Sequence, residues 1–365
     1  MKVVHILNRI EYSGAEIMLF QASGIFKKHH IETTLLSCEL KKGAFEDQML
    51  SVGYIINSAA AKGNIAFILK FYNYFKNNKF DMVHIHTEHL YVWKVIALRL
   101  TGHVNIIRSF HSNWPFTGWV RFKRILHRKL ATSMGVKKHA IGSGVYENEL
   151  ARFYNNTFII NNWIKLDKGL LKNRDAIRSI KRTEFNIDPK SFVIISVGGC
   201  SPIKNHSFII NLIKQLDSNG LNVIYLHVGT GVDEEKEKEL CHKLLVNSNI
   251  IFTGNRKDVP ELLMCADLFL LPSSQEGLSI ALLEAMYYNG LVIVNDAPGL
   301  NNMIINDSTG YVLNVNNPPA YVNLINKLIS NIINTERIKL SAREFVENNF
   351  SMEKNAEALI NYYKL

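Results

Sequence analysis

The hydrophobic positions of this chain gather in short continuous runs, and helical stretches separate the runs. Short apolar runs bounded by turn residues are typical of buried strands. In the first half the predicted strands cover residues 2–8, 32–38, 82–86 and 104–110, with helical patterns between them, as at 15–29 and 63–78. In the second half they cover 191–199, 222–231, 249–254, 267–273 and 291–296. Runs that are apolar throughout indicate parallel strands with both faces covered, so the pattern predicts an α/β protein with two Rossmann-like domains in succession.

A charged and weakly patterned segment separates the two sets of strands. It covers residues 166–190, and we interpret it as a linker region. The predicted first domain is 1–165 and the second is 191–349, while a last helical pattern covers 350–365. Ligands of such sheets bind at the carboxyl ends of the strands. Functional motifs are therefore expected just after predicted strands.

Length and composition agree with a globular protein of two domains. The chain has 365 residues, of which 47% are hydrophobic and 20% charged. No apolar run reaches the roughly 18–20 residues of a membrane span, and the opening MKVVHILNRI is too short and too polar for a signal peptide, so a cytoplasmic location is expected. The four cysteines, Cys38, Cys200, Cys241 and Cys265, form no CxxC pair. This spacing predicts core cysteines in a reducing compartment, and neither a disulfide framework nor a zinc site.

The charge of the chain is unevenly distributed. The net charge is +10, but residues 1–190 carry +15 and residues 191–365 carry −5. The most basic stretch is RFKRILHRKLATSMGVKKH (121–139), in which apolar residues recur at helical spacing. Two interpretations are open: a basic helix that rests on an anionic membrane surface, or an ordinary solvated helix face. A nucleic-acid partner is not expected, because no helix-turn-helix, finger or aromatic-rich RNA motif accompanies the charge.

Three motifs follow predicted strands. EYSGAE (11–16) contains Gly14, and VGGCSPIKNH (197–206) contains Lys204, a candidate phosphate-contacting cation. In both motifs a tight turn that needs glycine is the competing explanation. In EGLSIALLE (276–284), Glu276 precedes a predicted helix whose first amides can face an anion, and Glu284 lies within it. A carboxylate among apolar helix residues calls for hydroxyl or cationic partners, although a dipole-favoured Glu and a solvated Glu would explain the pair as well.

The same motifs resemble those of glycosyltransferase family 4, whose members are retaining enzymes of the GT-B architecture. EGLSIALLE is similar to the E-x7-E motif of the family, residues 254–296 to its nucleotide-binding core, and VGGCSPIKNH to its phosphate loop. SGAE (13–16) resembles its glycine-rich loop, and SFHS (109–112) the segment with its active-site histidine. The resemblance covers nearly the whole chain, and it is closest to members that build bacterial surface polysaccharides. It implies two Rossmann-like domains facing a central cleft, with the acceptor in the first domain and the C-terminal helix 350–365 crossing back to that domain.

The resemblance also implies roles for individual residues. Glu276 would hold hydroxyls of the donor sugar, Glu284 the ribose diol and Lys204 the diphosphate. His111 would lie beside the donor sugar, and it and Glu276 are the residues expected to be catalytic. Backbone groups of the remaining positions would bind the leaving phosphate or the base: Gly14, Gly277, Leu278 and Ser279 the phosphate, and Asn255 and Arg256 the base.

Two departures from the family pattern are visible. Gly199 stands where many relatives have arginine, so Lys204 serves alone or a cation such as Arg9 or Arg256 replaces the missing one. The segment Asn162-Trp163-Ile164-Lys165 differs from the N-G-I-D of the family.

The expected reaction is transfer of a sugar from a nucleotide-diphosphate sugar, most simply a UDP-sugar, to a saccharide acceptor. The basic first domain favours a lipid-linked acceptor, such as a polyprenyl-diphosphate saccharide, and a peripheral contact with the inner face of the cell membrane. No cofactor and no metal are expected: His84 and His86 share a strand face with His89 close by, but no carboxylate accompanies them and the chain has no D-x-D motif. The alternatives are a sugar-nucleotide epimerase, a phosphorylase, and a non-catalytic sugar-nucleotide-binding protein.

Overall fold

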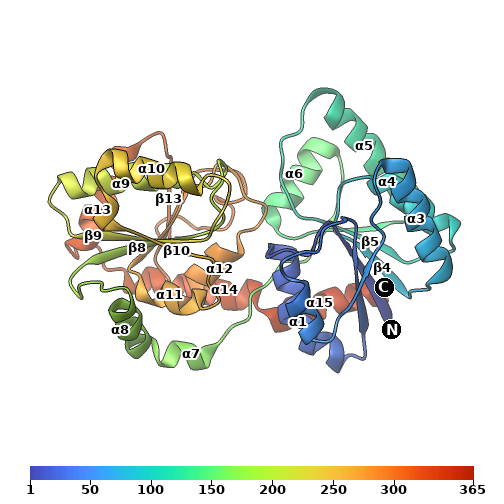
Figure 1. The fold of residues 1–365 in the computed structure, drawn as a ribbon, viewed down its shortest axis with the longest axis horizontal. Helices are drawn as coiled ribbons and strands as arrows, with labels where there is room; N and C mark the ends of the chain where they lie inside the picture. The colour runs from blue at the N-terminus through green and yellow to red at the C-terminus, as the bar shows by residue number, and fades with distance from the viewer. The chain divides into compact units, whose positions relative to one another are not determined.

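The computed structural model describes residues 1–365, which divide into two compact units (Figure 1). Unit 1 comprises Met1–Lys165 and Ser351–Leu365, and unit 2 comprises Leu166–Phe350. Each unit is a parallel sheet covered by helices. No helix combines the length and the apolar character needed to cross a bilayer.

Unit 1 contains a sheet of seven strands, all paired in parallel. The strands are β1 (Lys2–Leu7), β2 (Glu32–Ser37), β3 (Ile55–Ser58), β4 (Met82–Ile85), β5 (Ile106–Phe110), β6 (Lys137–Ala140) and β7 (Phe158–Ile159). Their order in the sheet is β3-β2-β1-β4-β5-β6-β7. The helices are α1 (Gly14–Lys28), α2 (Glu46–Ser51), α3 (Asn64–Asn77), α4 (Tyr91–Leu100), α5 (Gly118–Ser133), α6 (Ser143–Phe153) and α15 (Met352–Lys364).

Alternation along β1 divides the core of unit 1 between the two faces of its sheet. Val3 and Leu7 pack with residues of α1 and α15, whereas Val4 and Ile6 pack with residues of α3 and α4. Successive side chains of a strand point to opposite faces, so a strand buried on both sides must be apolar at every position. This accounts for the continuous apolar runs of the sequence. His5 breaks the run and lies on the same side as Val3, where its ring is 6.2 Å from that of Phe26.

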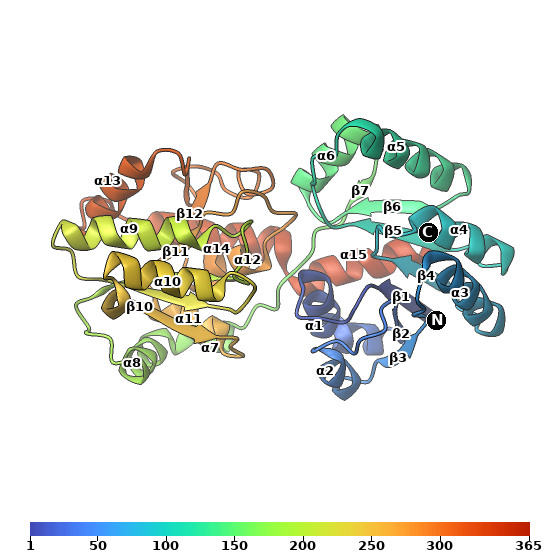
Figure 2. The same cartoon turned by 45° about the horizontal axis from the view of Figure 1, so that its top comes forward.

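Unit 2 contains a sheet of six parallel strands. They are β8 (Phe192–Val197), β9 (Val223–Val228), β10 (Ile250–Gly254), β11 (Leu268–Leu271), β12 (Val292–Asn295) and β13 (Tyr311–Leu313), in the order β10-β9-β8-β11-β12-β13. The helices are α7 (Lys168–Lys172), α8 (Arg174–Glu184), α9 (His206–Ser218), α10 (Glu234–Leu244), α11 (Val259–Cys265), α12 (Ile280–Tyr288), α13 (Pro318–Ile329) and α14 (Glu336–Phe350), with a 3₁₀ turn at Asn247–Asn249. Figures 1 and 2 show α9, α10 and α13 on one face of the sheet and α8 and α11 on the other.

The segment 166–190, predicted as a linker, is part of unit 2. It forms α7 and α8, and α8 packs against α11. Polar contacts attach α8: Arg178 and Arg182 bond the Asp267 carboxylate at 2.6 and 2.7 Å, and both donate to the Cys265 carbonyl. Because α8 is held through guanidinium groups, it has no apolar stripe. For this reason the sequence of residues 166–190 resembles that of a linker.

The last helix, α15, belongs to unit 1 although the preceding 185 residues belong to unit 2. The Met352 amide bonds the Ile164 carbonyl at 3.0 Å, and the Tyr363 hydroxyl lies 2.7 Å from Nδ1 of His84. Leu359, Ile360 and Tyr363 are buried among residues of α1 and β1. The C-terminal helix therefore completes the apolar core of the first unit.

Candidate functional site

The strand order of each sheet reverses once, and Gly14, Lys204 and Glu276 follow strands at these reversals. In unit 2 the chain proceeds outward from β8 to β9 and β10, then returns to place β11 on the other side of β8. In unit 1 the corresponding neighbours are β1 and β4. Loops leave in opposite directions at such a point, and the crevice between them is the usual ligand site of a parallel sheet.

Lys204 and Glu276 meet at the reversal of unit 2. Lys204 lies in the loop after β8, Glu276 lies in the loop after β11, and Nζ of the lysine is 2.6 Å from Oε1 of the glutamate. A backbone hydrogen bond from Ser274 to Ile203 holds the two loops together. The lysine chain extends over Gly198, where an added Cβ would lie 3.2 Å from its Cε. The structure thus brings together two residues that are 72 positions apart in the sequence.

The start of α12 supplies amide groups next to this ion pair. Ser279 is the N-cap of the helix, and its hydroxyl accepts a bond from the Leu282 amide at 3.3 Å. The amides of Gly277, Leu278 and Ser279 donate to no acceptor of the chain. Unpaired N–H groups at a helix start attract anions, because the helix dipole adds to their partial positive charge.

Glu284 lies one turn into α12 and has no partner in the chain. Its carboxylate takes part in no hydrogen bond or ion pair, and its side chain is half-buried between Leu283 and Ala285. Burial raises the pKa of Glu284 to about 7. A carboxylate in this position gains from hydroxyl donors, which stabilise its charged form.

Nucleotide-sugar binding is therefore expected to depend on pH through Glu284. If ligand hydroxyls bond the carboxylate, the ligand binds the ionised form of Glu284. The affinity for UDP-glucose is then expected to fall as the pH drops below about 7, by up to about tenfold for each pH unit. Calorimetric titrations between about pH 5.5 and 8 measure this, and UDP-glucose suits them because its diphosphate has no proton that titrates in this range. Glu284→Gln is expected to flatten the profile, and a wild-type profile that is already flat contradicts the assignment.

Asn255 and Arg256 follow β10 at the edge of the same sheet. Asn255 is exposed, whereas Arg256 bonds both oxygens of Asp258, at 2.8 and 2.7 Å, and Oε1 of Glu184 at 2.8 Å. Arg9, in unit 1, is paired with Glu11. Arg9 and Arg256, the two possible replacements for the arginine missing at Gly199, are thus both paired with carboxylates. Lys204 is left as the cation next to the amides of α12.

In unit 1, Gly14 is the first residue of α1, directly after β1. Ser13 precedes it as the N-cap residue, and the Ser13 hydroxyl donates to the carboxyl of Glu16 in the first turn. Burial raises the pKa of Glu16 to about 7. Gly14 follows β1 as Lys204 follows β8, so each sheet places one predicted site residue after a strand at its reversal.

His111 follows β5 and ends a chain of histidines. Its Nε2 lies 2.9 Å from Nδ1 of His86, and Nε2 of His86 lies 2.9 Å from Nδ1 of His5. His84 stacks on His86 with ring centroids 4.1 Å apart. Burial, followed by the charge of Arg108, lowers the pKa of His111 to about 3, so a neutral imidazole faces any ligand. His84 and His86 share one face as the sequence predicts, but His89 is exposed at a different surface.

A cavity of about 310 Å³ adjoins His111, and no sequence pattern predicts its charged lining. Glu88 pairs there with Arg108, Arg124 and Arg128, and Arg128 also binds the Glu149 carboxylate at 2.7 and 2.8 Å. Burial alone would raise the pKa of Glu88, but the three arginines outweigh it and hold that pKa at about 2. With two carboxylates against three guanidinium groups, this cavity keeps a positive charge beside His111.

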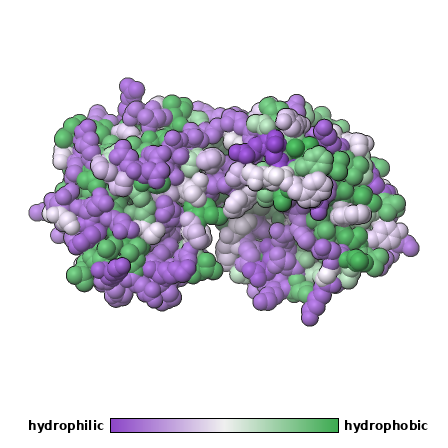
Figure 3. All heavy atoms as spheres, turned by 90° about the horizontal axis from the view of Figure 1, so that it is seen from above, coloured by the Kyte–Doolittle hydropathy of each residue, from purple (hydrophilic) through white to green (hydrophobic).

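The basic stretch 121–139 buries part of its positive charge inside unit 1. Within α5, Arg128 is buried and Arg124 is partly buried in the charged lining of the cavity. The exposed large residues of the helix are instead apolar: Trp119, Val120, Phe122, Leu126 and Leu130. Figure 3, a view from the side on which α5 lies, shows apolar residues among polar ones on unit 1. Arg124 and Arg128 of this helix therefore pair inside the unit, whereas Lys123 and Lys129 stay exposed.

Two family models match the chain. The model of glycosyltransferase family 4 matches residues 12–155, and that of glycosyl transferases group 1 matches residues 177–345. With its two parallel-sheet units, the chain has the GT-B fold, as the sequence predicts. It belongs to the group 1 and family 4 glycosyltransferases.

Relatives include enzymes of bacterial polysaccharide synthesis. The chain is 25% identical to the Escherichia coli UDP-Gal:α-D-GlcNAc-diphosphoundecaprenol α-1,3-galactosyltransferase over 81% of its own length and 78% of the relative's. It is 24% identical to the Staphylococcus aureus capsular polysaccharide biosynthesis glycosyltransferase CapH, over 90% and 91% of the two chains. Among solved structures, Anabaena HepE in complex with UDP and glucose superposes with a TM-score of 0.81 at 16% identity, covering 100% of this chain and 99% of that one.

Proposed function

We propose that this glycosyltransferase moves a sugar, with retention of anomeric configuration, from a UDP-sugar to a saccharide acceptor carried on polyprenyl diphosphate. The product would be an intermediate of a bacterial surface polysaccharide, such as capsule, O-antigen or exopolysaccharide. One observation carries the proposal: the Lys204–Glu276 pair lies beside the unpaired amides of Gly277–Ser279 at the strand reversal of unit 2.

This arrangement suits the departure of a nucleoside diphosphate. Breaking a glycosyl–phosphate bond develops negative charge on the diphosphate, and fixed N–H groups and a lysine stabilise that charge. Glu276, which holds Lys204 in place, has a second carboxylate oxygen with which to accept a bond from a sugar hydroxyl. Glu284 is left to bind the ribose diol. In unit 1, the neutral His111 is the proposed contact to the sugar, and the cavity with its three arginines suits an anionic acceptor group.

The names of the relatives support the donor and acceptor classes. The Escherichia coli relative uses UDP-Gal and a diphosphoundecaprenol-linked saccharide, the Staphylococcus aureus relative acts in capsule synthesis, and the structural neighbour is complexed with UDP. We propose the same chemical classes for this chain. We also propose that the diphosphate is stabilised without a divalent ion, so that added Mg²⁺ or Mn²⁺ leaves the rate nearly unchanged.

The test is transfer itself. The purified protein is incubated with UDP-glucose, UDP-galactose and their N-acetyl counterparts, together with synthetic polyprenyl-diphosphate saccharides. Formation of a new glycoside supports the proposal, and the anomeric proton coupling of that product reports retention or inversion. Conversion of the nucleotide sugar without an acceptor would indicate an epimerase instead, and tight binding without turnover would indicate a binding protein.

We propose further that α5 brings unit 1 to the lipid surface that carries the acceptor. The exposed Trp119 and Phe122 stack with ring centroids 5.4 Å apart, on the same helix as the exposed Lys123 and Lys129. Aromatic rings that enter the headgroup region, with lysines near anionic lipid, are typical of reversible membrane contact.

Vesicle binding is expected to depend on these two rings. Replacing Trp119 and Phe122 together by serine should weaken binding to phosphatidylglycerol vesicles by about tenfold or more, since both rings are 55% or more exposed and contribute little to the core. The matched control replaces Val232 and Ile332, which are 85% and 71% exposed on unit 2, and should bind like the wild type. Co-sedimentation at low salt measures both, and wild-type protein that stays in the supernatant refutes the contact.

A further inference from the structure

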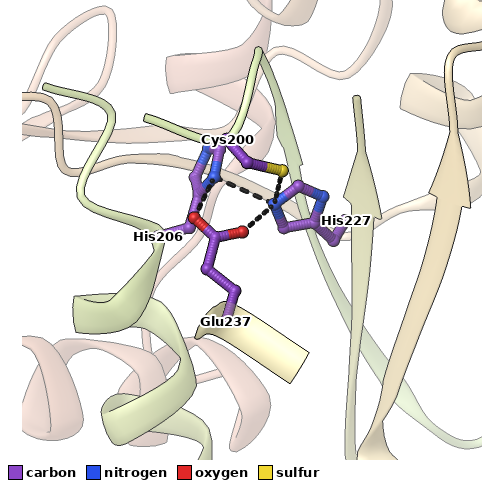
Figure 4. A group of neighbouring side chains, drawn as sticks. All are labelled: Cys200, His206, His227 and Glu237. Atoms are coloured by element: carbon purple, nitrogen blue, oxygen red, sulfur yellow. Dashed lines mark hydrogen bonds and ion pairs between the residues drawn. The ribbon is translucent and has the colours of Figure 1, made fainter. Parts of the chain in front are cut away.

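Four side chains with metal-binding atoms converge inside unit 2. They are Cys200 in the loop after β8, His206 at the start of α9, His227 on β9 and Glu237 in the first turn of α10 (Figure 4). All four are buried, and one ligand atom from each lies within 4.8 Å of those of the other three. None of the four belongs to the residues assigned to the substrates.

The distances between these atoms resemble those around a tetrahedral ion. Nε2 of His227 lies 3.6 Å from Sγ of Cys200, 2.9 Å from Nδ1 of His206 and 3.0 Å from Oε2 of Glu237, while His206 Nδ1 lies 3.3 Å from Glu237 Oε1. Ligands at the usual zinc distances are separated by about 3.5 Å for a sulfur–nitrogen pair and about 3.3 Å for nitrogen and oxygen pairs. These four distances therefore differ from those of a zinc site by only a few tenths of an ångström, and all four ligand atoms lie within 4.8 Å of one another.

Hydrogen bonds alone satisfy this arrangement poorly. A single nitrogen, Nε2 of His227, faces the sulfur, the second imidazole and the carboxylate, but an N–H group can donate fully to only one of them. The outer nitrogens, His206 Nε2 and His227 Nδ1, are buried and have no partner, so the protein does not fix either tautomer. Lone pairs that converge on one point are what a cation needs.

The charges of these four side chains also favour a bound cation. The only ion-pair partners of the buried Glu237 carboxylate are the two histidines, which supply no permanent positive charge. A buried carboxylate without a permanent cation is costly. A dication bound by one carboxylate, one thiolate and two neutral imidazoles would leave the site with no net charge.

The backbone holds Cys200 firmly in this place. Its amide donates to the Thr230 carbonyl at 3.2 Å, and its carbonyl accepts from the Asp233 amide at 3.2 Å. Gly231 lies so close that an added Cβ would be 2.4 Å from the Cys200 carbonyl oxygen. The loop after β8 is thus packed against the loop after β9, and the backbone of Cys200 cannot move away from the histidines without moving both loops.

We propose that Cys200, His206, His227 and Glu237 form a structural Zn²⁺ site. Binding is a proton exchange without redox change: the Cys200 thiol loses its proton to solvent, and its sulfur forms a bond to the ion. Zinc fits better than Mg²⁺ or Ca²⁺, because the set contains a thiolate and two imidazoles and has one oxygen ligand. With four protein ligands the site is closed, so the ion has no position left for substrate.

The site would fix the loop that carries Lys204. Cys200 and His206 lie at the two ends of this loop, and an ion bound to both would hold the lysine between them toward Glu276. This consequence rests on the proposed function, whereas the metal site itself does not. The proposal departs from the sequence-based expectation of no metal, which considered only CxxC pairs and the histidines of the first domain.

Metal content tests the site directly. Protein purified without a polyhistidine tag or chelator is expected to contain about one zinc per chain by mass spectrometry. After removal of the metal and addition of Co²⁺, a thiolate-to-cobalt charge-transfer band and intense tetrahedral d–d bands should appear. The thiolate band separates this site from the histidine cluster of unit 1, which contains no cysteine.

Variants identify the ligands. Cys200→Ser is expected to lose the charge-transfer band and most of the zinc, while the control Cys241→Ser, which alters another buried cysteine of unit 2, keeps both. Wild-type protein that contains no zinc and gives no cobalt–thiolate band overturns the proposal, as does a Cys200→Ser variant with unchanged metal content. Zinc without transferase activity would refute only the proposed function, and transfer by a protein unable to bind zinc would refute only the metal site.

Discussion

Glu276→Gln is expected to lower the rate of sugar transfer by roughly 10²–10³-fold, the loss typical for removing one electrostatic contact to a transition state. The glutamine keeps the shape of the side chain but loses the charge that binds Lys204 at 2.6 Å and that would accept a hydroxyl of the donor sugar. Steady-state kinetics with a UDP-sugar and a lipid-linked acceptor measure the effect. The substitution should mainly lower kcat, with a smaller effect on KM, because the proposed contact acts on the reacting sugar.

Glu235→Gln is the matched control for this substitution. The Glu235 side chain is 83% exposed on α10 and pairs only with Lys238, so its replacement should leave transfer unchanged. Full activity of Glu276→Gln would remove Glu276 from the site. An equal loss in both variants would indicate a general change in unit 2 rather than a role in the reaction.

Lys204→Ala is expected to raise the dissociation constant of a UDP-sugar by about 10- to 100-fold, since a hydrogen bond to a charged group contributes about 1.5–3 kcal/mol. The alanine removes the lysine beside the α12 amides and also leaves Glu276 without its cation. Calorimetric titration with UDP-glucose measures the change. Because the two side chains are in contact, the effects of Lys204→Ala and Glu276→Gln should not add.

Lys243→Ala provides the comparison for the lysine. Lys243 is exposed on α10 and takes part in no ion pair, so its loss changes the net charge of unit 2 by the same amount. UDP-glucose should bind this variant like the wild type. If both lysine variants bind equally well, the loop after β8 does not contact the diphosphate.

The strand pattern predicts most of both sheets but misses their edges. β1, β2, β4, β5 and β8–β12 coincide with predicted apolar runs, because strands covered on both faces are apolar at most positions. β3, β6, β7 and β13 were not predicted, and three of them are edge strands. β6 reads KKHA, which carries no hydrophobic signal although its last two residues are buried. A short polar strand is specified by the neighbour with which it pairs.

The side on which a helix buries its residues could not be predicted where polar contacts replace apolar ones. In α5 the helical spacing of Phe122, Leu126 and Leu130 is evident, but it is Arg128 and Ala131 that are buried. Arg128 gains two carboxylate partners from β4–α4 and α6, at Glu88 and Glu149. Those partners are 40 and 21 residues away from Arg128 in the sequence, so no local sequence pattern predicts them.

The sequence by itself determined the class of fold and the residue types of the donor motifs, since strand runs, glycine loops and helix starts are local properties of consecutive residues. Only the tertiary structure decided which of these residues meet. The assembly of unit 2 brings Lys204 to Glu276, pairs Arg256 with Glu184, and gathers Cys200, His206, His227 and Glu237 around one point. Such contacts join segments that are separated in the chain, and their geometry depends on how the sheet is assembled rather than on the spacing of residues along it.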